Sequence, residues 1–431
     1  MKNKIIYIAL LLVASITLNA QMVTKAKTVE VILKGGTLHT VSAGDKVADL
    51  HIKNGKIMAI GNNLSSTTAT TVDCTGKHVY PGMIDGGTRL GLSEIGAVSL
   101  TNDYNELGDF IPHMKALTAV NPNSVSIPVT RVNGVTTVLA MPAGGVFPGT
   151  SALINLIGYT PEQMSAGYQG VIMNFPSSGK RGRWDRRSEE DIKKDAEKAN
   201  KKINDIWDKA MLYAKIDSAA AAGNQKRNDY NPQMDALLPV VRGEAKLLVE
   251  VNKENDILSA LKWIKEKGID AALMGVRDGW KVADKIAEAR LPVICGPVLG
   301  LPGRSSDRYD VIYKNPGKML EAGVKVAIRT RETENVRNLP FNAGFAAAYG
   351  MGTEAALRAV TLTPAEIFGV ADMLGSLDEG KVANLFVSDG DPFEPKTTIS
   401  HLYISGRDVP MESRHTLLYN EFLERDPGLQ K

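Results

Sequence analysis

Residues 80–91 read Tyr80-Pro81-Gly82-Met83-Ile84-Asp85-Gly86-Gly87-Thr88-Arg89-Leu90-Gly91. The apolar run at the start of this stretch belongs to a predicted strand over 78–85. Further apolar runs of strand length follow at 134–141, 170–175, 246–251, 269–274, 291–295 and 324–328. Helical stretches lie between several of these runs, for example at 256–267 and 280–289. Apolar strands alternating with helices are typical of a parallel sheet covered on both faces. Seven or eight such units predict an α/β fold, a (β/α)8 TIM-like barrel over residues 85–375.

The two flanks of the barrel have β character. Short strands fill 29–84, where Asn54-Gly55 between apolar runs is a strong hairpin signal. Residues 376–410 return to the same pattern, so both segments together predict a small composite β-sandwich domain. Residues 411–431 are predicted to form a C-terminal tail.

A charged helix is predicted over 188–222, as an insertion in the barrel. Ser188 and Asp191 resemble a capping box, with Asp in place of the usual Glu or Gln. The insertion is either a solvated outer helix, which its charges favour, or a lid or oligomer contact.

Residues 1–20 have the features of a cleavable signal peptide. Lys2 and Lys4 precede an apolar run over 5–18, which is shorter than the roughly 20 residues that span a bilayer. The sequence therefore predicts a periplasmic or secreted protein with no membrane span after cleavage.

The two cysteines, Cys74 and Cys295, fall in different predicted domains and favour buried thiols over a disulfide. A net charge of +3 gives no electrostatic reason to expect nucleic acid as a partner.

Several motifs together resemble the metal-dependent amidohydrolase superfamily, in its imidazolonepropionase-like branch. They are the 81–85 run, Arg131 with 134–138, and a late segment that contains Pro364-Ala365, Gly375-Ser376-Leu377 and 380–385. Together these motifs cover most of the chain, in the order and with the spacing of the family. The resemblance implies a metal centre at the C-terminal mouth of the barrel, where the metal activates a water and an Asp on strand 8 handles its proton.

The same resemblance places other residues where the family has its metal ligands. The two strand 1 histidine positions are Gly87 and Arg89, and the strand 5 segment aligns with Glu250-Val251-Asn252. The strand 6 histidine position falls at or near Gly275, and Arg331 stands at the position of the catalytic Asp. Glycine has no side-chain ligand, and protonated arginine cannot donate a lone pair to a cation. Zinc is thus expected for the family, but its ligands are missing from this chain.

The histidine count supports this expectation. Of six histidines, only His113 lies in a segment that could approach the mouth, while His39, His51, His78, His401 and His415 lie elsewhere. Asp85, Asp103, Glu250 and His113 are the remaining groups that could assemble a metal site. Nucleophilic chemistry has little support, because Cys295 and Ser305-Ser306 have no recognisable base nearby.

Arginine replaces metal ligands at this predicted mouth. Arg89, Arg277, Arg329 and Arg331 all fall near strand ends, and guanidinium groups bind carboxylates and phosphates through paired hydrogen bonds. One interpretation is an anion-binding pocket. The other, which the cost of burying unpaired arginine favours, is a plug in which Glu250 and acids such as Asp278 neutralise the arginines.

Three alternative functions are consistent with this sequence. The first is a degenerate amidohydrolase that acts as a non-catalytic or regulatory subunit, as a homo-oligomer or with an active paralogue. The second is a hydrolase of C–N bonds other than peptide bonds with a rearranged site. The third is a protein that binds a small anionic ligand.

Overall fold

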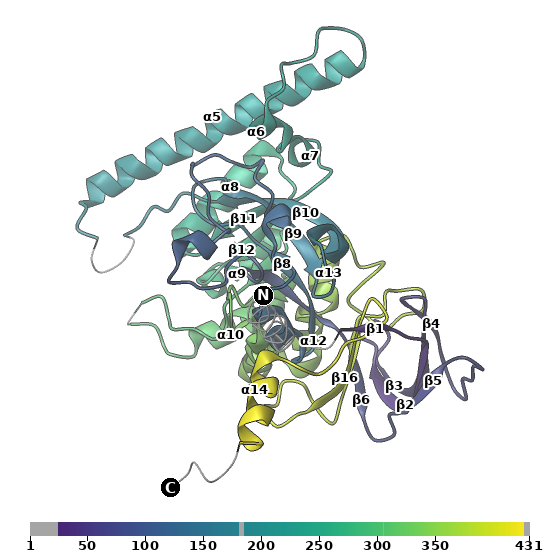
Figure 1. The fold of residues 1–431 in the computed structure, drawn as a ribbon. Coiled ribbons are helices and arrows are strands. Elements are labelled where there is room, and N and C mark those ends of the chain that lie inside the picture. Colours follow the sequence, from purple (N-terminus) through teal and green to yellow (C-terminus); the bar gives the residue numbers. More distant parts are fainter. Residues whose placement is uncertain (1–24, 181–184, 305, 426–431) are drawn as a thin grey trace, which may run out of the picture.

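The computed structural model describes residues 25–180, 185–304 and 306–425 (Figure 1). The predicted signal peptide, residues 1–20, lies outside these ranges. Within them, no helix combines the length and the apolar character needed to cross a membrane.

Eight strands form the sheet of a barrel in the order β14-β13-β12-β11-β10-β9-β8-β7. Seven of them correspond to the seven predicted runs. The strands are β7 (Met83–Thr88), β8 (Val135–Ala140), β9 (Gly149–Asn155), β10 (Ser165–Asn174), β11 (Leu247–Val251), β12 (Ala271–Gly275), β13 (Val293–Cys295) and β14 (Val326–Ile328).

One strand departs from the predicted (β/α)8 pattern. β9 pairs antiparallel with both β8 and β10, whereas the other neighbours pair in parallel. The connection from β8 to β9 is a short loop that contains no helix, so the chain reverses direction instead of crossing over. The prediction of eight parallel strands was therefore wrong for β9, and the barrel sheet is mixed.

The ends of the first and last barrel strands meet at the mouth. The backbone N–H of Arg331 donates to the carbonyl of Gly87 at 3.0 Å, and the N–H of Arg89 donates to Glu332 at 2.9 Å. Arg331 has a φ of 59°, in the left-handed region, which lets the chain turn between these two bonds. The residues that follow β7 and β14 are thereby fixed side by side.

Helices lie around the barrel sheet, and α8 shows how local sequence signals set the bounds of a helix. In α8, Glu254 and Asp256 lie in the first turn and two lysines in the last, and Gly268 ends the helix at a φ of 65°. The helices are α2 (Ala116–Ala119), α3 (Ser126–Arg131), α4 (Pro161–Met164), α5 (Glu189–Ala221), α6 (Pro232–Asp235), α7 (Leu238–Val241), α8 (Glu254–Lys267), α9 (Ala283–Ala289), α10 (Val311–Glu321), α11 (Leu339–Ala346), α12 (Thr353–Ala359), α13 (Leu362–Ile367) and α14 (Arg414–Leu423).

The long insertion is helical, as predicted. α5 is capped by Ser188, whose hydroxyl accepts the backbone N–H of Asp191 at 3.0 Å. Figure 1 shows α5 along one edge of the molecule, beyond the barrel. It is anchored midway, where Trp207 packs edge-on against Trp263 of α8 at 5.8 Å and Asn204 accepts the Trp263 indole N–H at 3.1 Å.

Both termini contribute to a second sheet of nine strands. Its order is β1-β17-β16-β15-β6-β2-β3-β4, with β5 beside β2, so C-terminal β15 pairs with N-terminal β6. The composite origin is as predicted, whereas the two-layer sandwich stays a prediction, because the strands form one hydrogen-bonded sheet. They are β1 (Lys27–Thr28), β2 (Val31–His39), β3 (Asp45–Lys53), β4 (Lys56–Gly61), β5 (Thr70–Asp73), β6 (His78–Pro81), β15 (Leu385–Ser388), β16 (Ile399–Ile404) and β17 (Arg407–Asp408).

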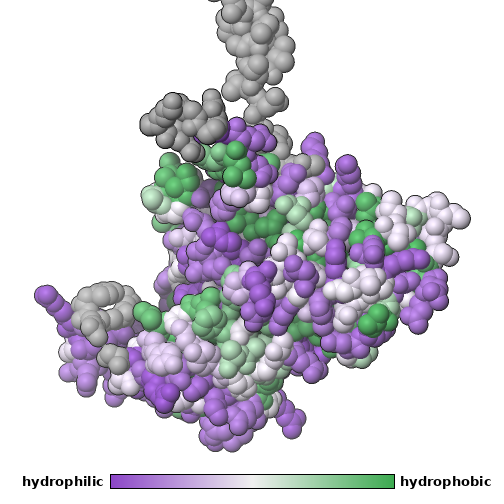
Figure 2. All heavy atoms as spheres, turned by 90° about the horizontal axis from the view of Figure 1, so that it is seen from below, coloured by the Kyte–Doolittle hydropathy of each residue, from purple (hydrophilic) through white to green (hydrophobic). Residues whose placement is uncertain are grey.

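The interior is apolar. One buried cluster, which includes Ile84, Leu139, Ile172, Leu248 and Ile294, fills the barrel between its strands. Cys74 and Cys295 are both buried free thiols, as expected. On the outer face seen in Figure 2, hydrophobic residues are scattered among hydrophilic ones.

Candidate functional site: an arginine-lined barrel mouth

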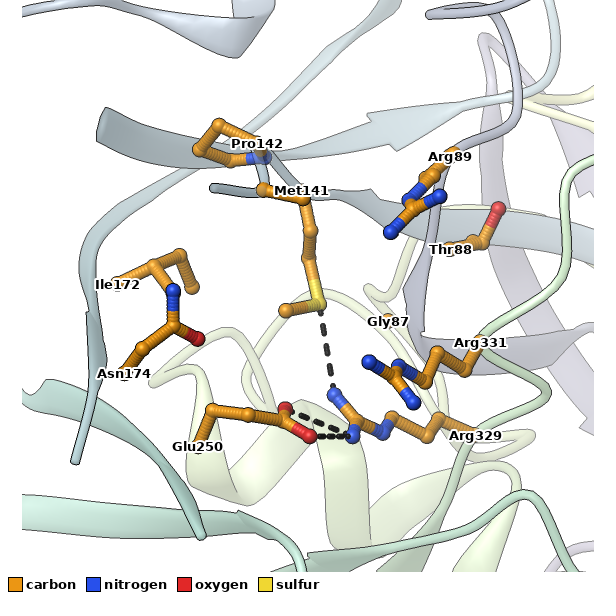
Figure 3. Close-up of a pocket in the computed structure, with 11 residues that line it drawn as sticks. Gly87, Thr88, Arg89, Met141, Pro142, Ile172, Asn174, Glu250, Arg329 and Arg331 are labelled. Atoms are coloured by element: carbon orange, nitrogen blue, oxygen red, sulfur yellow. Dashed lines mark hydrogen bonds and ion pairs between the residues drawn. The ribbon is translucent and has the colours of Figure 1, made fainter. Parts of the chain in front are cut away.

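A small cavity of about 40 Å³ opens at the C-terminal ends of the barrel strands. This end of a barrel carries the active sites of such folds. The residues around the cavity come from β7, β10, β11 and the segments that follow β7, β8 and β14 (Figure 3). They are Gly87, Thr88, Arg89, Met141, Pro142, Ala143, Ile172, Asn174, Glu250, Arg329 and Arg331.

A buried ion pair forms the floor of this cavity. Nη2 of Arg329 lies 2.8 Å from Oε1 and 2.7 Å from Oε2 of Glu250 (Figure 3). Arg329 is 1% exposed and has the largest side chain among the fully buried residues. Asn252 donates to Glu250 at 3.2 Å, so the carboxylate has two donors. Burial alone would raise the pKa of Glu250, but Arg329 and then Arg331 outweigh it and hold that pKa below its ordinary value.

Two glycines make room for this pair. A Cβ at Gly87 would collide with Sδ of Met141 and would lie 3.1 Å from Cδ of Arg329. A Cβ at Gly275 would lie 2.6 Å from Oδ1 of Asn252, 2.9 Å from Oε1 of Glu250 and 3.1 Å from Nη2 of Arg329. These are two of the positions at which the family resemblance expects histidine. The space beside the two glycines is therefore occupied by Met141, Asn252 and the Arg329–Glu250 pair.

The mouth does not fit a divalent cation. Gly87 and Gly275 offer no ligand, Arg89 and Arg331 offer only positive charge, and Glu250 is already paired. Over the three described ranges, no group of three or more His, Cys, Asp or Glu side chains could hold a metal ion. A cation in this volume would also be repelled by guanidinium groups at short range.

Three arginines near the cavity form no side-chain ion pair with a described residue: Arg89, Arg277 and Arg331. Arg89 lies over the ring of Tyr104 at 4.1 Å, and Nε of Arg277 is buried without a hydrogen-bond partner. Arg331 is exposed at the rim, but loss of hydration around its guanidinium group lowers its pKa, which Glu250 partly offsets. The nearby positive charges lower that pKa further. The group stays protonated at neutral pH, so the mouth carries excess positive charge.

Asp85 supports the mouth from below. Its carboxyl group is fully buried and accepts hydrogen bonds from the Thr330 hydroxyl at 2.5 Å, the Thr330 N–H at 3.2 Å and the Gly87 N–H at 2.9 Å. Burial raises its pKa to about 6, against these hydrogen bonds. Asp85 thus joins the ends of β7 and β14 and positions the residues on either side of the cavity.

The structure assembles most of the predicted pocket. Gly87, Arg89, Glu250 and Arg331 line the cavity, and Asn252 and Gly275 contact the ion pair. His113 does not line it, and its Nδ1 is buried without a hydrogen-bond partner within the described ranges. The prediction that Asp278 neutralises a mouth arginine was wrong, because the ion pair that Asp278 forms is with Lys281, at 3.9 Å.

The structure also identifies site residues that the sequence did not indicate. The sequence did not distinguish Arg329 from the other three arginines. Arg329 lies two residues before Arg331, so the alternation of side chains along a strand would place both on the same side. Asn174 and Met141 come from β10 and from the end of β8, and no sequence signal pointed to them. Cys295 is an inert thiol, because burial raises its pKa to about 12.

Comparison with known proteins agrees with the fold. A sequence profile described as "Amidohydrolase family" matches residues 79–409. Because this match covers most of the chain, the chain belongs to the amidohydrolase family.

Individual relatives are more distant. A D-hydantoinase of Geobacillus stearothermophilus is 44% identical over 78 residues, 18% of this chain and 16% of that protein. The amidohydrolase tasK of Hapsidospora irregularis is 21% identical over 404 residues, 84% of this chain and 39% of that protein. The chain thus spans well under half the length of the curated relatives it matches.

Solved structures show the same fold over nearly the whole chain. An amidohydrolase from Thermotoga maritima is 25% identical with a TM-score of 0.77, over 88% of this chain and 99% of that one. A molinate hydrolase is 17% identical with a TM-score of 0.55, over 89% and 95% of the two chains.

Proposed function

We propose that this chain is a non-catalytic member of the amidohydrolase family that binds a small oxyanion, such as a carboxylate, at the mouth of its barrel. One observation carries the proposal: Arg89 and Arg331, which have no ion-pair partner in the described chain, line a cavity whose floor is a neutralised Arg329–Glu250 pair. The proposal combines the two interpretations of the mouth, since Arg329 is paired with Glu250 whereas Arg89 and Arg331 are not paired.

The size and walls of the cavity limit the ligand. A volume of about 40 Å³ holds a group of a few heavy atoms, such as a carboxylate or a sulfate. Arg331 and Arg89 supply donors on one side (Figure 3), whereas the side-chain amide of Asn174 already donates to the carbonyls of Gly144 and Gly145. Met141, Pro142 and Ile172 offer an apolar wall to a short carbon chain. A small monocarboxylate satisfies both sides.

Titration calorimetry at low ionic strength tests this proposal with acetate, propionate and sulfate. We expect saturable binding that Arg331→Ala weakens by about 10-fold or more, the loss typical of a hydrogen bond between charged groups. Lys262→Ala, on an exposed part of α8, removes the same charge elsewhere and controls for general electrostatics. Equal affinities in the two variants would contradict a site at the mouth.

Hydrolysis of a C–N bond is the second candidate, favoured by the relatives that are named as hydantoinase, dihydropyrimidinase and molinate hydrolase. Glu250 would have to act as the base. Its pairing with Arg329 and its lowered pKa make it a weak base, which disfavours this candidate. Assays with hydantoin and dihydrouracil, with and without added zinc, test it: turnover that Glu250→Gln abolishes would establish catalysis.

The predicted export and oligomeric state complete the proposal. Lys2, Lys4 and the apolar run over 5–18 support cleavage of residues 1–20 and a periplasmic or secreted location. A homo-oligomer, or a complex with an active paralogue, would give a non-catalytic chain a regulatory role. Mass spectrometry of the protein from its native host tests cleavage, and light scattering tests assembly.

A further inference from the structure

A second and much larger cleft lies away from the barrel mouth. Its volume is about 910 Å³, within the range of small-molecule sites, and it shares no lining residue with the mouth. The connection between β2 and β3, together with β6, forms the wall on the terminal sheet. The N-terminal part of α12 and residues 391–393 form the facing wall. Figure 1 shows α12 on the side of the barrel nearest to that sheet.

Tyr80 presents an unpartnered hydroxyl in this cleft. Its side chain lines the cleft, is 6% exposed, and forms no hydrogen bond with a described residue. The ring is fixed by stacking on His39 at 4.1 Å and on Phe386 at 5.4 Å. The hydroxyl is not among the fully buried atoms that lack a partner, so it is accessible from the cleft. A ligand in the cleft can form a hydrogen bond with it.

The charges around Tyr80 are mainly negative. Asp45, Glu354 and Asp391 line the cleft, and Asp391 and Asp45 lie close enough to the phenol to add to the burial that raises its pKa. The phenol therefore stays neutral, and its oxygen can accept a hydrogen bond.

The basic groups of the cleft are already engaged. Arg358 is paired with Glu366 at 2.6 Å. His39 lies between Asp45 and His78, at 2.9 Å from each. Burial holds the pKa of His39 below its ordinary value, so its ring is neutral at pH 7. The open part of the cleft thus has a negative net charge.

Apolar side chains complete the cleft. Met351, Leu357 and Phe393 line it beside the carboxylates. We propose that this cleft is a second ligand site, which takes a small organic amine with an aromatic or apolar body. The ammonium group donates to Asp391, Asp45 and the Tyr80 oxygen, and the body packs against Phe393 and Leu357. This site does not depend on the proposed anion site at the mouth.

Ligand-observed NMR and calorimetry on the purified full-length protein test the proposal with three probes of one shape: benzylamine, benzyl alcohol and phenylacetate. We expect saturable binding of benzylamine, at least 10-fold weaker binding of benzyl alcohol, and none of phenylacetate at this site. Equal binding of the three probes, or preference for phenylacetate, in the Arg331→Ala variant, whose carboxylate site at the mouth is weakened, would overturn the proposal.

Variants assign the site. Tyr80→Phe removes only an unpartnered hydroxyl, so we expect an unchanged melting temperature and benzylamine binding weakened about 3- to 10-fold. Glu354→Gln, at the exposed start of α12, should weaken it less, by about 2- to 5-fold, and does not endanger the fold. Glu266→Gln on α8 removes an exposed acid elsewhere and should have no effect. Benzylamine affinity that is unchanged in both cleft variants would refute the assignment, whereas insensitivity to Arg331→Ala separates this site from the mouth.

Discussion

Arg329 and Glu250 form a buried ion pair in the volume where the family resemblance expects metal ligands. The Arg329 Nη2 atom contacts both carboxylate oxygens, at 2.8 and 2.7 Å, and only 1% of the Arg329 side chain is exposed. Gly87 and Gly275 are the positions whose missing side chains leave room for it. Glycine at these two positions and the buried Arg329 are thus structurally linked, because a larger side chain at either glycine would collide with the pair or its neighbours.

Removing one partner of this pair should be costly. Glu250→Ala leaves Arg329 buried without a counter-charge, and we expect a loss of about 3 kcal/mol in the free energy of unfolding, measured in urea. Glu266→Ala, which breaks an exposed pair with Lys262, should cost less than about 0.5 kcal/mol. The double variant Glu250→Leu/Arg329→Met should recover much of the loss. A double variant no better than Glu250→Ala would show that packing, not charge, dominates here.

A methyl group at Gly275 should also destabilise the fold. Gly275 and Gly268 both have left-handed backbone, with φ of 83° and 65°, but a Cβ at Gly268 meets nothing within 4 Å. Gly268→Ala therefore reports the backbone strain alone, about 1 kcal/mol. Gly275→Ala adds collisions with Asn252 and Glu250, and we expect at least about 1 kcal/mol more. Equal melting temperatures for the two variants would mean that the ion pair can move aside.

Most of the fold could be predicted because its signals are local. Apolar runs of strand length marked seven of the eight barrel strands, and Ser188 marked the start of α5. β9 was missed because the residues before it are rich in glycine and no helix precedes it. Strand direction depends on which partner the chain meets, and no local pattern records that.

The site could be predicted only in part. Register with the family motifs placed Gly87, Arg89 and Arg331 at the mouth. The sequence also predicts that Glu250 neutralises an arginine at the mouth, which the pair with Arg329 confirms. Which of the four arginines pairs with it could not be predicted, because that depends on the space that two glycines from distant segments leave between them. The same holds for Asn174 and Met141, which reach the cavity from β10 and from the end of β8.

Added metal should have little effect on this protein. We expect less than about a tenth of an equivalent of zinc by elemental analysis after exposure and dialysis, because a zinc site requires about three protein ligands. EDTA should leave the melting temperature unchanged. Carbonic anhydrase treated in parallel verifies the loading procedure. One or two tightly bound equivalents would contradict the ligand assignment, and Glu250 and His113 would be the first residues to mutate.

The stability of the protein should depend on pH through Asp85. Its pKa is about 6 in the folded state and near the ordinary 3.8 when unfolded, so the folded state binds more protons between these values. The contribution of Asp85 to stability is therefore greatest below about pH 4 and is lost as the pH rises to about 6. The two-unit difference corresponds to about 3 kcal/mol. Urea unfolding from pH 4 to 7 measures it.

Asp85→Asn is the matched variant for this measurement, because it cannot titrate. Glu250 has a lowered pKa, so its contribution has the opposite sign: it is present above the unfolded pKa and is lost as the pH falls. The comparison therefore uses the difference between the parent protein and Asp85→Asn at each pH, in which the Glu250 contribution cancels. We expect the parent to lose stability relative to the variant as the pH rises from 4 to 6, and a constant difference above that. A difference that does not change with pH would mean that Asp85 is ionised throughout, held by Thr330 and the Gly87 N–H.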